Sequence, residues 1–292
     1  MRFFFGLISG FLTVISLYII NSASLMIAPP DSTHTAASDS VLSDPALHLQ
    51  PMAQSPVSAN TFVTVNRRAL TPKVPETYDY SPSPTVTDAA TSGRSGAVRW
   101  QAVLPAGDDP APLVLLFAGT GRSPLSVLDM WLPTARQHDL ALLAPDTRDD
   151  PQHFLSALKG DTFQQLIADI SATRAIDPDR IYLFGHSQGG QVALTMANQI
   201  RGPWQAVATH AGHPQATMIR DAKHGPPLRL YLGGRDHIFN AAAAKEAGQR
   251  YARAGHRTEL HLIPNHTHWF YEIGPKIADD TWKWFQAHST AQ

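Results

Sequence analysis

A serine placed between two glycines is the feature of this sequence that points most plainly to chemistry. Residues 185–190 read Gly-His-Ser-Gln-Gly-Gly, with an apolar run at residues 181–184 before them and a helical pattern after them. A serine on a tight strand-to-helix turn exposes its hydroxyl, and the helix start offers free N–H groups to an oxyanion. We therefore predict Ser187 as a nucleophile and the N–H of Gln188 as an oxyanion donor. The alternative is a glycine-rich helix start with an incidental serine.

The segment that leads to this turn resembles a known superfamily. Residues 176–182 read Ile-Asp-Pro-Asp-Arg-Ile-Tyr and are followed closely by the Gly-x-Ser-x-Gly pattern. On these motifs, residues 96–288 resemble the α/β-hydrolase superfamily, in particular secreted esterases related to polyhydroxyalkanoate depolymerases and feruloyl esterases, and prolyl-oligopeptidase-type domains. The resemblance implies a serine hydrolase with a Ser-His-Asp triad in the chain order Ser, Asp, His. Nothing in the sequence implies a cofactor.

The resemblance places the acid of the triad after a later strand, and Asp236 fills that position. It follows a predicted strand at residues 228–232 and the residues Gly-Gly-Arg. An acid at this point would hold an imidazole in the required tautomer and stabilise the imidazolium ion. The alternatives are that Asp236 caps the following helix, or that Asp221 is the acid.

Two histidines compete for the role of general base. Residues 264–270, which follow a predicted strand at residues 258–263, read Pro-Asn-His-Thr-His-Trp-Phe. The resemblance places the base a few residues beyond the turn and an aromatic residue directly after it, which favours His268. His266 is the alternative base, or else a supporting group or a surface histidine.

These histidines are not expected to bind a metal ion. His266 and His268 form a His-x-His pair, but no carboxylate cluster accompanies them in the sequence. His210 and His213 follow another predicted strand. We expect them to be loop residues or to line the pocket rather than to act as ligands.

The second oxyanion donor is expected in the loop after an apolar run at residues 113–117. This loop reads Ala-Gly-Thr-Gly at residues 118–121, where the superfamily often has His-Gly-x-Gly. By position, the resemblance implies the backbone N–H of Thr120 as the donor. Ala118 departs from the usual histidine, which leaves the backbone donors intact but removes a bracing side chain. The alternative is an ordinary glycine turn.

Strands and helices alternate along the part of the chain that must position these residues. Strands are predicted at residues 97–104, 113–117, 140–144, 181–184, 206–209, 228–232 and 258–263. Helices are predicted at residues 127–138, 163–174, 188–200, 241–254 and 275–288. The alternation predicts an α/β fold, with a mostly parallel central sheet and helices on both faces. Residues 211–227 are too few for a cap domain, which predicts little or no lid and an open site.

The N-terminal third of the sequence differs in composition from the rest. Residues 1–28 contain an apolar run at residues 3–20, which predicts a cleaved signal peptide or a retained signal anchor. We therefore expect an exported protein, periplasmic or secreted, that contacts a membrane only through this segment. Residues 29–95 are rich in Pro, Ser and Thr and are predicted to be a linker, with an edge strand at residues 61–65 as the alternative. The α/β-hydrolase domain is predicted at residues 96–292.

Composition excludes several function classes. The 292 residues include no cysteine, which excludes disulfides, cysteine-ligated metals and a cysteine nucleophile. The 23 basic and 24 acidic residues give a net charge of -1, so nucleic acid is not expected as a partner. We expect hydrolysis of a small-molecule or polymeric carboxylic ester through an acyl-enzyme. The alternatives are a peptidase or amidase, and a catalytically inactive extracellular binding domain.

Overall fold

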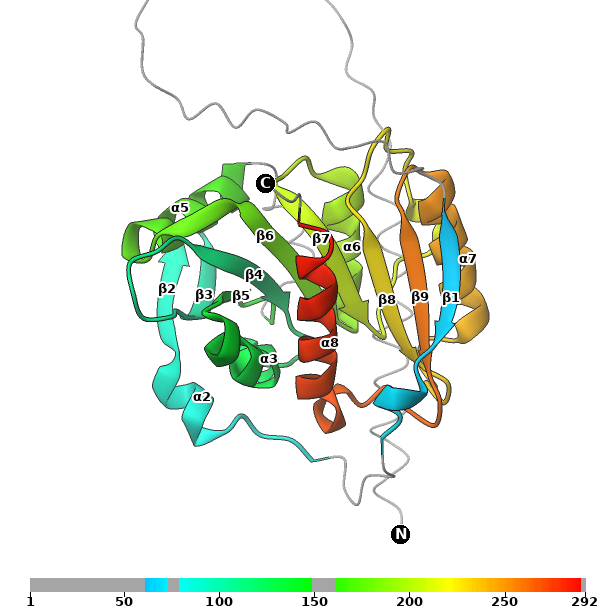
Figure 1. Ribbon diagram of the computed structural model, residues 1–292, viewed down its shortest axis with the longest axis horizontal. Helices are drawn as coiled ribbons and strands as arrows, with labels where there is room; N and C mark the ends of the chain where they lie inside the picture. Colours follow the sequence, from blue (N-terminus) through cyan, green and yellow to red (C-terminus); the bar gives the residue numbers. More distant parts are fainter. Residues whose placement is uncertain (1–60, 73–78, 149–160, 290–292) are drawn as a thin grey trace, which may run out of the picture. The chain divides into compact units, whose positions relative to one another are not determined.

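A nine-stranded sheet forms the centre of the molecule (Figure 1). The computed structural model describes residues 61–72, 79–148 and 161–289, which belong to one compact unit. The strands are β1 (Phe62–Asn66), β2 (Thr91–Ser95), β3 (Val98–Val103), β4 (Ala111–Phe117), β5 (Ala141–Pro145), β6 (Ile176–His186), β7 (Trp204–His210), β8 (Leu228–Gly233) and β9 (Thr258–Ile263). The helices are α2 (Pro84–Ala89), α3 (Pro124–His138), α5 (Asp161–Thr173), α6 (Gln188–Gln199), α7 (Ala241–Arg253) and α8 (Gly274–Gln286).

The sheet is mostly parallel, as the alternation of elements predicts. Its strand order is β1-β9-β8-β7-β6-β4-β5-β3-β2. Every neighbouring pair from β1 to β5 in this order is parallel, whereas the pairs β5–β3 and β3–β2 are antiparallel. The carboxyl ends of β4, β6, β7, β8 and β9 therefore lie along one edge of the sheet (Figure 1). Loops that leave this edge bring distant parts of the sequence together.

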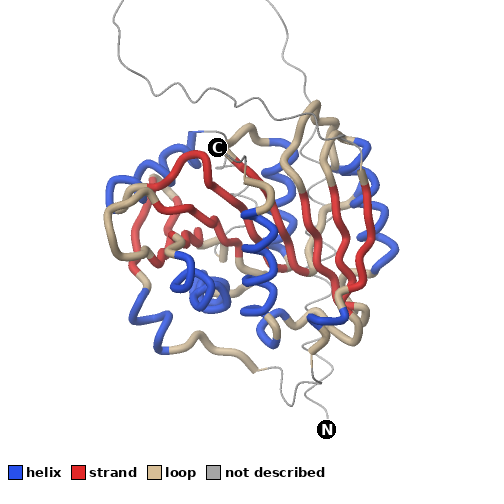
Figure 2. Tube along the Cα trace, viewed as in Figure 1, coloured by secondary structure: helices blue, strands red, loops and turns tan. Residues whose placement is uncertain are grey.

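Helices cover both faces of the sheet (Figure 2). Strand β4 shows why both faces need cover, since all seven of its residues are buried. Leu113, Leu115 and Phe117 join the apolar cluster that packs under α5, α6 and α7. Val114 and Leu116, which point the other way, join the cluster under α3 and α8. A continuous apolar run is what a parallel strand buried on both faces requires.

Strand β1 extends the sheet beyond the predicted domain. It pairs parallel with β9 at the sheet edge, and the N–H of Arg67 donates to the carbonyl of Leu262 at 2.8 Å. Phe62 lies against Gly248 of α7, where a Cβ would meet its ring at 2.4 Å. The alternative to the linker prediction, an edge strand at residues 61–65, is therefore what the structure shows. The short alternating segment is stable because β9 supplies its hydrogen bonds and α7 covers its ring.

Residues 79–95 are also part of the domain. Asp129 of α3 accepts hydrogen bonds from the hydroxyl of Tyr80 at 2.7 Å and from the hydroxyl of Ser83 at 2.6 Å. Ser83 in turn caps α2, and β2 pairs with β3. The linker prediction for residues 29–95 is therefore wrong for residues 61–72 and 79–95. The rest of that range lies outside the described residues, as does the predicted signal segment at residues 1–28.

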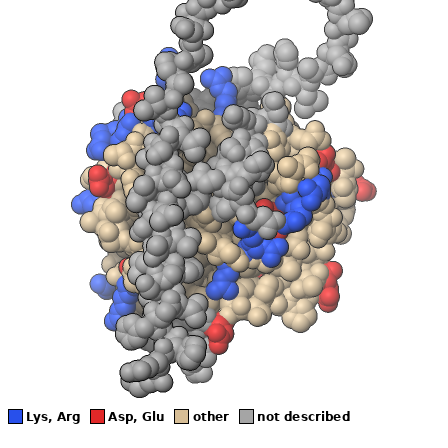
Figure 3. Space-filling model, turned by 180° about the vertical axis from the view of Figure 1, so that it is seen from behind, with Lys and Arg blue, Asp and Glu red and all other residues tan. Residues whose placement is uncertain are grey.

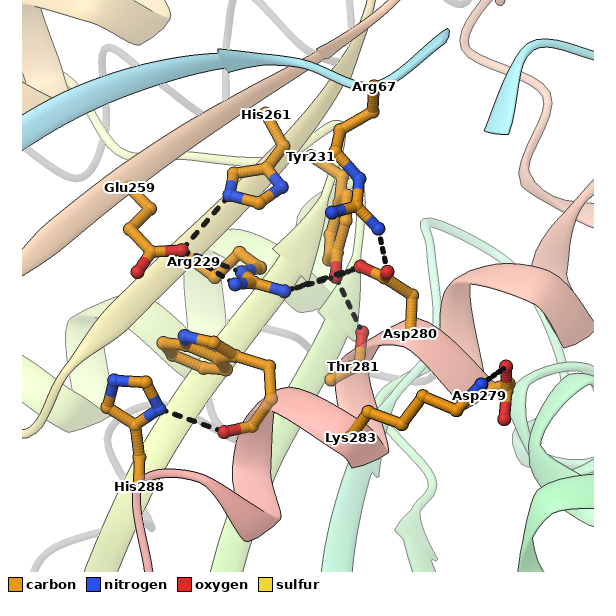
Figure 4. A network of polar contacts seen from close by, with 11 residues as sticks. Arg67, Arg229, Tyr231, Glu259, His261, Asp279, Asp280, Thr281, Lys283 and His288 are labelled. Carbon is orange, nitrogen blue, oxygen red and sulfur yellow. Dashed lines mark hydrogen bonds and ion pairs between the residues drawn. The ribbon is translucent and has the colours of Figure 1, made fainter. Parts of the chain in front are cut away.

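A buried ionic network joins β1, β8, β9 and α8 (Figure 4). Arg229 donates two hydrogen bonds to one carboxylate oxygen of Glu259, at 2.9 and 2.7 Å, and lies 3.3 Å from Asp280. Arg67 forms an ion pair with Asp280. Burial raises the pKa of Glu259, but hydrogen bonds from His261 and Arg229 outweigh it and lower that pKa to about 2. The network thus ties the N-terminal segment to the last helix.

The described surface carries charges of both signs. On the face seen in Figure 3, basic and acidic side chains are interspersed. Within the described ranges, no helix has the length and apolar character needed to cross a membrane. Between β7 and β8 the only helical segment is the 3-10 turn η2 (Ala216–Met218), so no cap domain is inserted there.

Candidate active site

Ser187 occupies a strained turn between β6 and α6. Its backbone angles are φ 55° and ψ −120°, a conformation that costs free energy for any residue other than glycine. The turn is tight on both sides. A Cβ on Gly185 would lie 2.1 Å from the carbonyl oxygen of Gly189, and one on Gly189 would lie 2.1 Å from that of Phe117. These glycines let the turn lift the serine above the carboxyl end of β6, as the spacing predicts.

His268 bridges Ser187 and Asp236. Its Nε2 lies 3.0 Å from Oγ of Ser187, and its Nδ1 lies 2.9 Å from Oδ2 of Asp236. The carboxylate can only accept, so Nδ1 carries the hydrogen and Nε2 is left to accept the serine proton. The three side chains come from the loops that follow β6, β8 and β9. They form one continuous line of hydrogen bonds along the edge of the sheet.

Backbone donors hold Asp236 in its charged form. Its Oδ1 accepts the N–H groups of Ile238 at 2.8 Å and Phe239 at 2.9 Å, and its side chain is fully buried. Burial raises the pKa of Asp236, but the hydrogen bonds from His268 and from the two backbone N–H groups give it a net lowered pKa. The aspartate therefore contacts both the turn after β8 and the imidazole, whereas Asn240 and not Asp236 caps α7.

The loop after β4 lies against Ser187. A Cβ on Gly119 would be 3.5 Å from Cβ of Ser187, which puts Thr120 in the next position along this loop. Gln188 is the first residue of α6, so its N–H has no acceptor within the helix. Arg122, which follows this loop, lies over two aromatic rings. Its guanidinium lies 5.4 Å from the ring centre of Trp269 and 5.3 Å from that of Tyr271.

The alternative site residues lie elsewhere. His266 is fully buried, and its Nε2 bonds to Nε2 of His210 at 2.8 Å rather than to Ser187. The side chain of Asp221 is 84% exposed and pairs with Arg250 at 2.7 Å. Among the described residues, no cluster of His, Asp and Glu could hold a metal ion.

Sequence reasoning missed the rings that surround His268. Phe239 stacks near it with ring centres 5.8 Å apart, and the ring of His186 lies 5.1 Å away. His186 is itself bonded to His210, which the sequence placed in a loop or a pocket wall but which is fully buried at the end of β7. The one available signal was that His186 and His210 both end apolar runs, where parallel strands bring side chains together.

Comparison with known proteins identifies one matching family. Residues 145–289, which include all three members of the hydrogen-bonded line, match the Dienelactone hydrolase family. No curated protein matches the chain significantly.

Solved structures share the fold at low sequence identity. An S-formylglutathione hydrolase from Agrobacterium tumefaciens is 17% identical, with a TM-score of 0.55, over 68% of this chain and 94% of that one. Est1E from Butyrivibrio proteoclasticus is 15% identical, with a TM-score of 0.53, over 68% and 99%. Thermogutta terrifontis esterase 2, in a form phosphorylated by paraoxon, is 17% identical, with a TM-score of 0.55, over 70% and 96%. These likenesses concern the fold.

Proposed function

We propose that this hydrolase, a member of the α/β-hydrolase superfamily, cleaves carboxylic esters through Ser187, His268 and Asp236 and an acyl-enzyme intermediate. The observation that carries the proposal is the line of hydrogen bonds from Asp236 through His268 to Ser187, at 2.9 and 3.0 Å. A serine, a base and an orienting acid at these distances are the parts that nucleophilic acyl transfer requires.

In the first half-reaction, Oγ of Ser187 bonds to the ester carbonyl carbon while its proton passes to Nε2 of His268. The negative charge moves to the carbonyl oxygen, where the N–H groups of Gln188 and Thr120 would stabilise it. Asp236 stabilises the imidazolium ion that has formed. The intermediate then collapses. The bond to the alcohol oxygen breaks, and the alcohol leaves with the proton from His268.

In the second half-reaction, water replaces the alcohol. His268 takes a proton from the water as its oxygen attacks the acyl carbon on Ser187. The second tetrahedral intermediate collapses, the carboxylic acid departs, and the proton returns to Oγ. The same base thus serves both halves without a metal ion or a cofactor in the scheme.

The match to the Dienelactone hydrolase family and the esterase neighbours support esters over amides as substrates. The short connection between β7 and β8 supports a substrate that is bulky or polymeric, because it inserts no cap domain. Amide cleavage by the same site is the competing function.

Hydrolysis rates on matched substrates test the proposal. The full chain should hydrolyse p-nitrophenyl esters of short acyl groups, and Ser187→Ala should lower kcat by about 10³-fold or more. The same acyl groups presented as p-nitroanilides should react far more slowly. Faster cleavage of the anilides would favour the amidase, and an inactive chain or an active Ser187→Ala variant would contradict the proposed function.

A further inference from the structure

Three buried histidines form a second line of hydrogen bonds behind the site. His186 ends β6, His210 ends β7, and His266 lies in the loop after β9; they are 5%, 0% and 0% exposed. Nδ1 of His186 lies 3.0 Å from Nδ1 of His210, and Nε2 of His210 lies 2.8 Å from Nε2 of His266. None of the three takes part in the proposed reaction steps. We call this set the histidine bridge.

The bridge joins the two segments that must meet for catalysis. His186 directly precedes the nucleophile, and His266 lies two residues before the base. Between them the N–H of Ser187 donates to the carbonyl of His210 at 2.9 Å. Loops after β6 and β9 are thus linked through a ring on β7, which lies between them in the sheet. No part of the Ser187, His268 and Asp236 line is needed to make this link.

The contacts fix where the hydrogens of the bridge lie. Nδ1 of His186 is also 3.3 Å from the carbonyl oxygen of His210, which can only accept, so this nitrogen carries the hydrogen. Nδ1 of His210 then accepts, and a neutral ring must carry its hydrogen on Nε2. Nε2 of His266 accepts that hydrogen bond, which leaves the hydrogen on Nδ1. That Nδ1 faces the carboxylate of Glu272 at 3.9 Å.

The surroundings keep all three rings neutral. Burial is the main cause that lowers the pKa of His186 and His210 well below the usual value and lowers that of His266 to about 4. The rings also disfavour charge on one another, and Arg122 and His268 add to this at His186. Asp236 acts in the opposite sense at His266, but burial outweighs it. Each neutral ring offers one donor and one acceptor, which the bridge requires.

We propose that His210 is a positioning residue, whose two ring hydrogen bonds hold the turn bearing Ser187 in register with the loop bearing His268. The inference rests on the proposed function, because the distance it controls is the one that the serine proton crosses. His186 also contacts the loop that bears His268 directly, since the centres of the two rings lie 5.1 Å apart. Without the bridge, Ser187 and His268 remain in the site but the distance between them is less well fixed. A shift of about 1 Å at reacting atoms can lower the rate about 10²-fold.

His256 provides a matched control. It is also fully buried, and its ring also has two partners, the carbonyl of Pro226 at 2.9 Å and Nδ2 of Asn198 at 3.2 Å. It precedes β9, so it lies at the edge of the sheet opposite the site. Replacing His210 or His256 with phenylalanine removes a buried imidazole that has two hydrogen-bond partners. Only one replacement breaks the bridge.

The first experiment compares His210→Phe with His256→Phe in the full chain. We expect both to lower Tm, but only His210→Phe to lower kcat, by about 10- to 100-fold, with KM within about threefold of the wild type. The rate at which paraoxon modifies the serine should fall in parallel with kcat. His210→Gln, whose amide can still donate toward His266, should recover part of the loss. Equal kcat for the two phenylalanine variants would overturn the positioning role.

The second experiment needs no variant to fold. Nitrogen-15 NMR of the imidazole rings in the wild-type full chain at neutral pH distinguishes protonated from unprotonated ring nitrogens. The bridge requires hydrogens on Nδ1 of His186, Nε2 of His210 and Nδ1 of His266. A hydrogen on Nδ1 of His210, or a doubly protonated ring, would overturn the assignment. A wild-type chain that neither reacts with paraoxon nor cleaves esters would instead overturn the proposed function.

Discussion

Ser187 has a strained backbone conformation that its neighbours enforce. The surrounding backbone leaves no room for a side chain at Gly185 or Gly189, and the carbonyl of His210 accepts a hydrogen bond from the N–H of Ser187 at 2.9 Å. His268 is held in turn by a carboxylate that itself accepts two backbone N–H groups. Each reacting atom is thus fixed by a partner that is itself fixed, which is how strain at an active site persists.

Substitution of the two neighbouring histidines separates their roles. His268→Ala should lower kcat/KM about as much as loss of the serine, by about 10³-fold or more, because the triad acts as a unit. His266→Ala should cost about tenfold, since it removes one end of the histidine bridge but no reacting group. Both variants are assayed on one activated ester. A nearly normal His268→Ala variant beside an inactive His266→Ala variant would show that the base is assigned to the wrong ring.

The secondary-structure elements bring polar side chains together in two places. At the carboxyl edge of the sheet, loops after β4, β6, β8 and β9 build the site. Along the length of β8 and β9, Arg229, Glu259 and His261 make the ionic network with α8 (Figure 4). Arg229 also lies over the ring of Trp284, 4.7 Å from its centre. Breaking such a buried network leaves charges without partners, which is costly.

Glu259→Gln should reveal this network in the pH dependence of stability. The pKa of Glu259 is lowered in the folded protein from 4.5 to about 2. A lowered folded pKa stabilises the protein above the unfolded value, and that contribution fades as pH falls from about 4.5 toward 2. The variant should be less stable than wild type by about 3 kcal/mol near pH 7, and the difference should shrink in acid. Denaturant unfolding at several pH values measures it. A difference that does not vary with pH would contradict the account.

At the scale of the whole molecule, the domain begins earlier than its composition indicates. Tyr80 stacks on Tyr271 with ring centres 3.9 Å apart, so a residue before the predicted domain boundary touches the segment that follows His268. Arg67 reaches α8 through Asp280. The N-terminal segment therefore supports both the sheet edge and the site.

Truncation tests this wider boundary. A chain of residues 54–292 should keep the Tm and the ester hydrolysis of the full chain, because it retains β1, α2 and β2. A chain of residues 96–292 loses the Arg67–Asp280 ion pair and the hydrogen bonds that Tyr80 and Ser83 donate to Asp129, so it should unfold at lower temperature and lose activity. Calorimetry and one ester assay compare the three chains. An equally stable and active 96–292 chain would mean that the earlier segment is dispensable.

The parts of the fold that the sequence predicts are those whose signals are local. Continuous apolar runs mark β4 and β5, and two glycines around a serine mark the turn at Ser187. Strand β2, in contrast, reads Thr-Ser-Gly-Arg-Ser, with no apolar alternation, and is a strand because β3 offers it a backbone to pair with. The histidine bridge joins residues 24 and 56 positions apart, and only the sheet order brings them together.

The central claim is that Ser187 is the nucleophile, and covalent trapping tests it most directly. Treating the full chain with paraoxon and mapping the adduct by peptide mass spectrometry reports which oxygen attacks. We expect one diethylphosphoryl group per chain, located on Ser187, with parallel loss of ester hydrolysis and no adduct in Ser187→Ala. An adduct on another residue, or equal modification of the Ser187→Ala variant, would contradict the account.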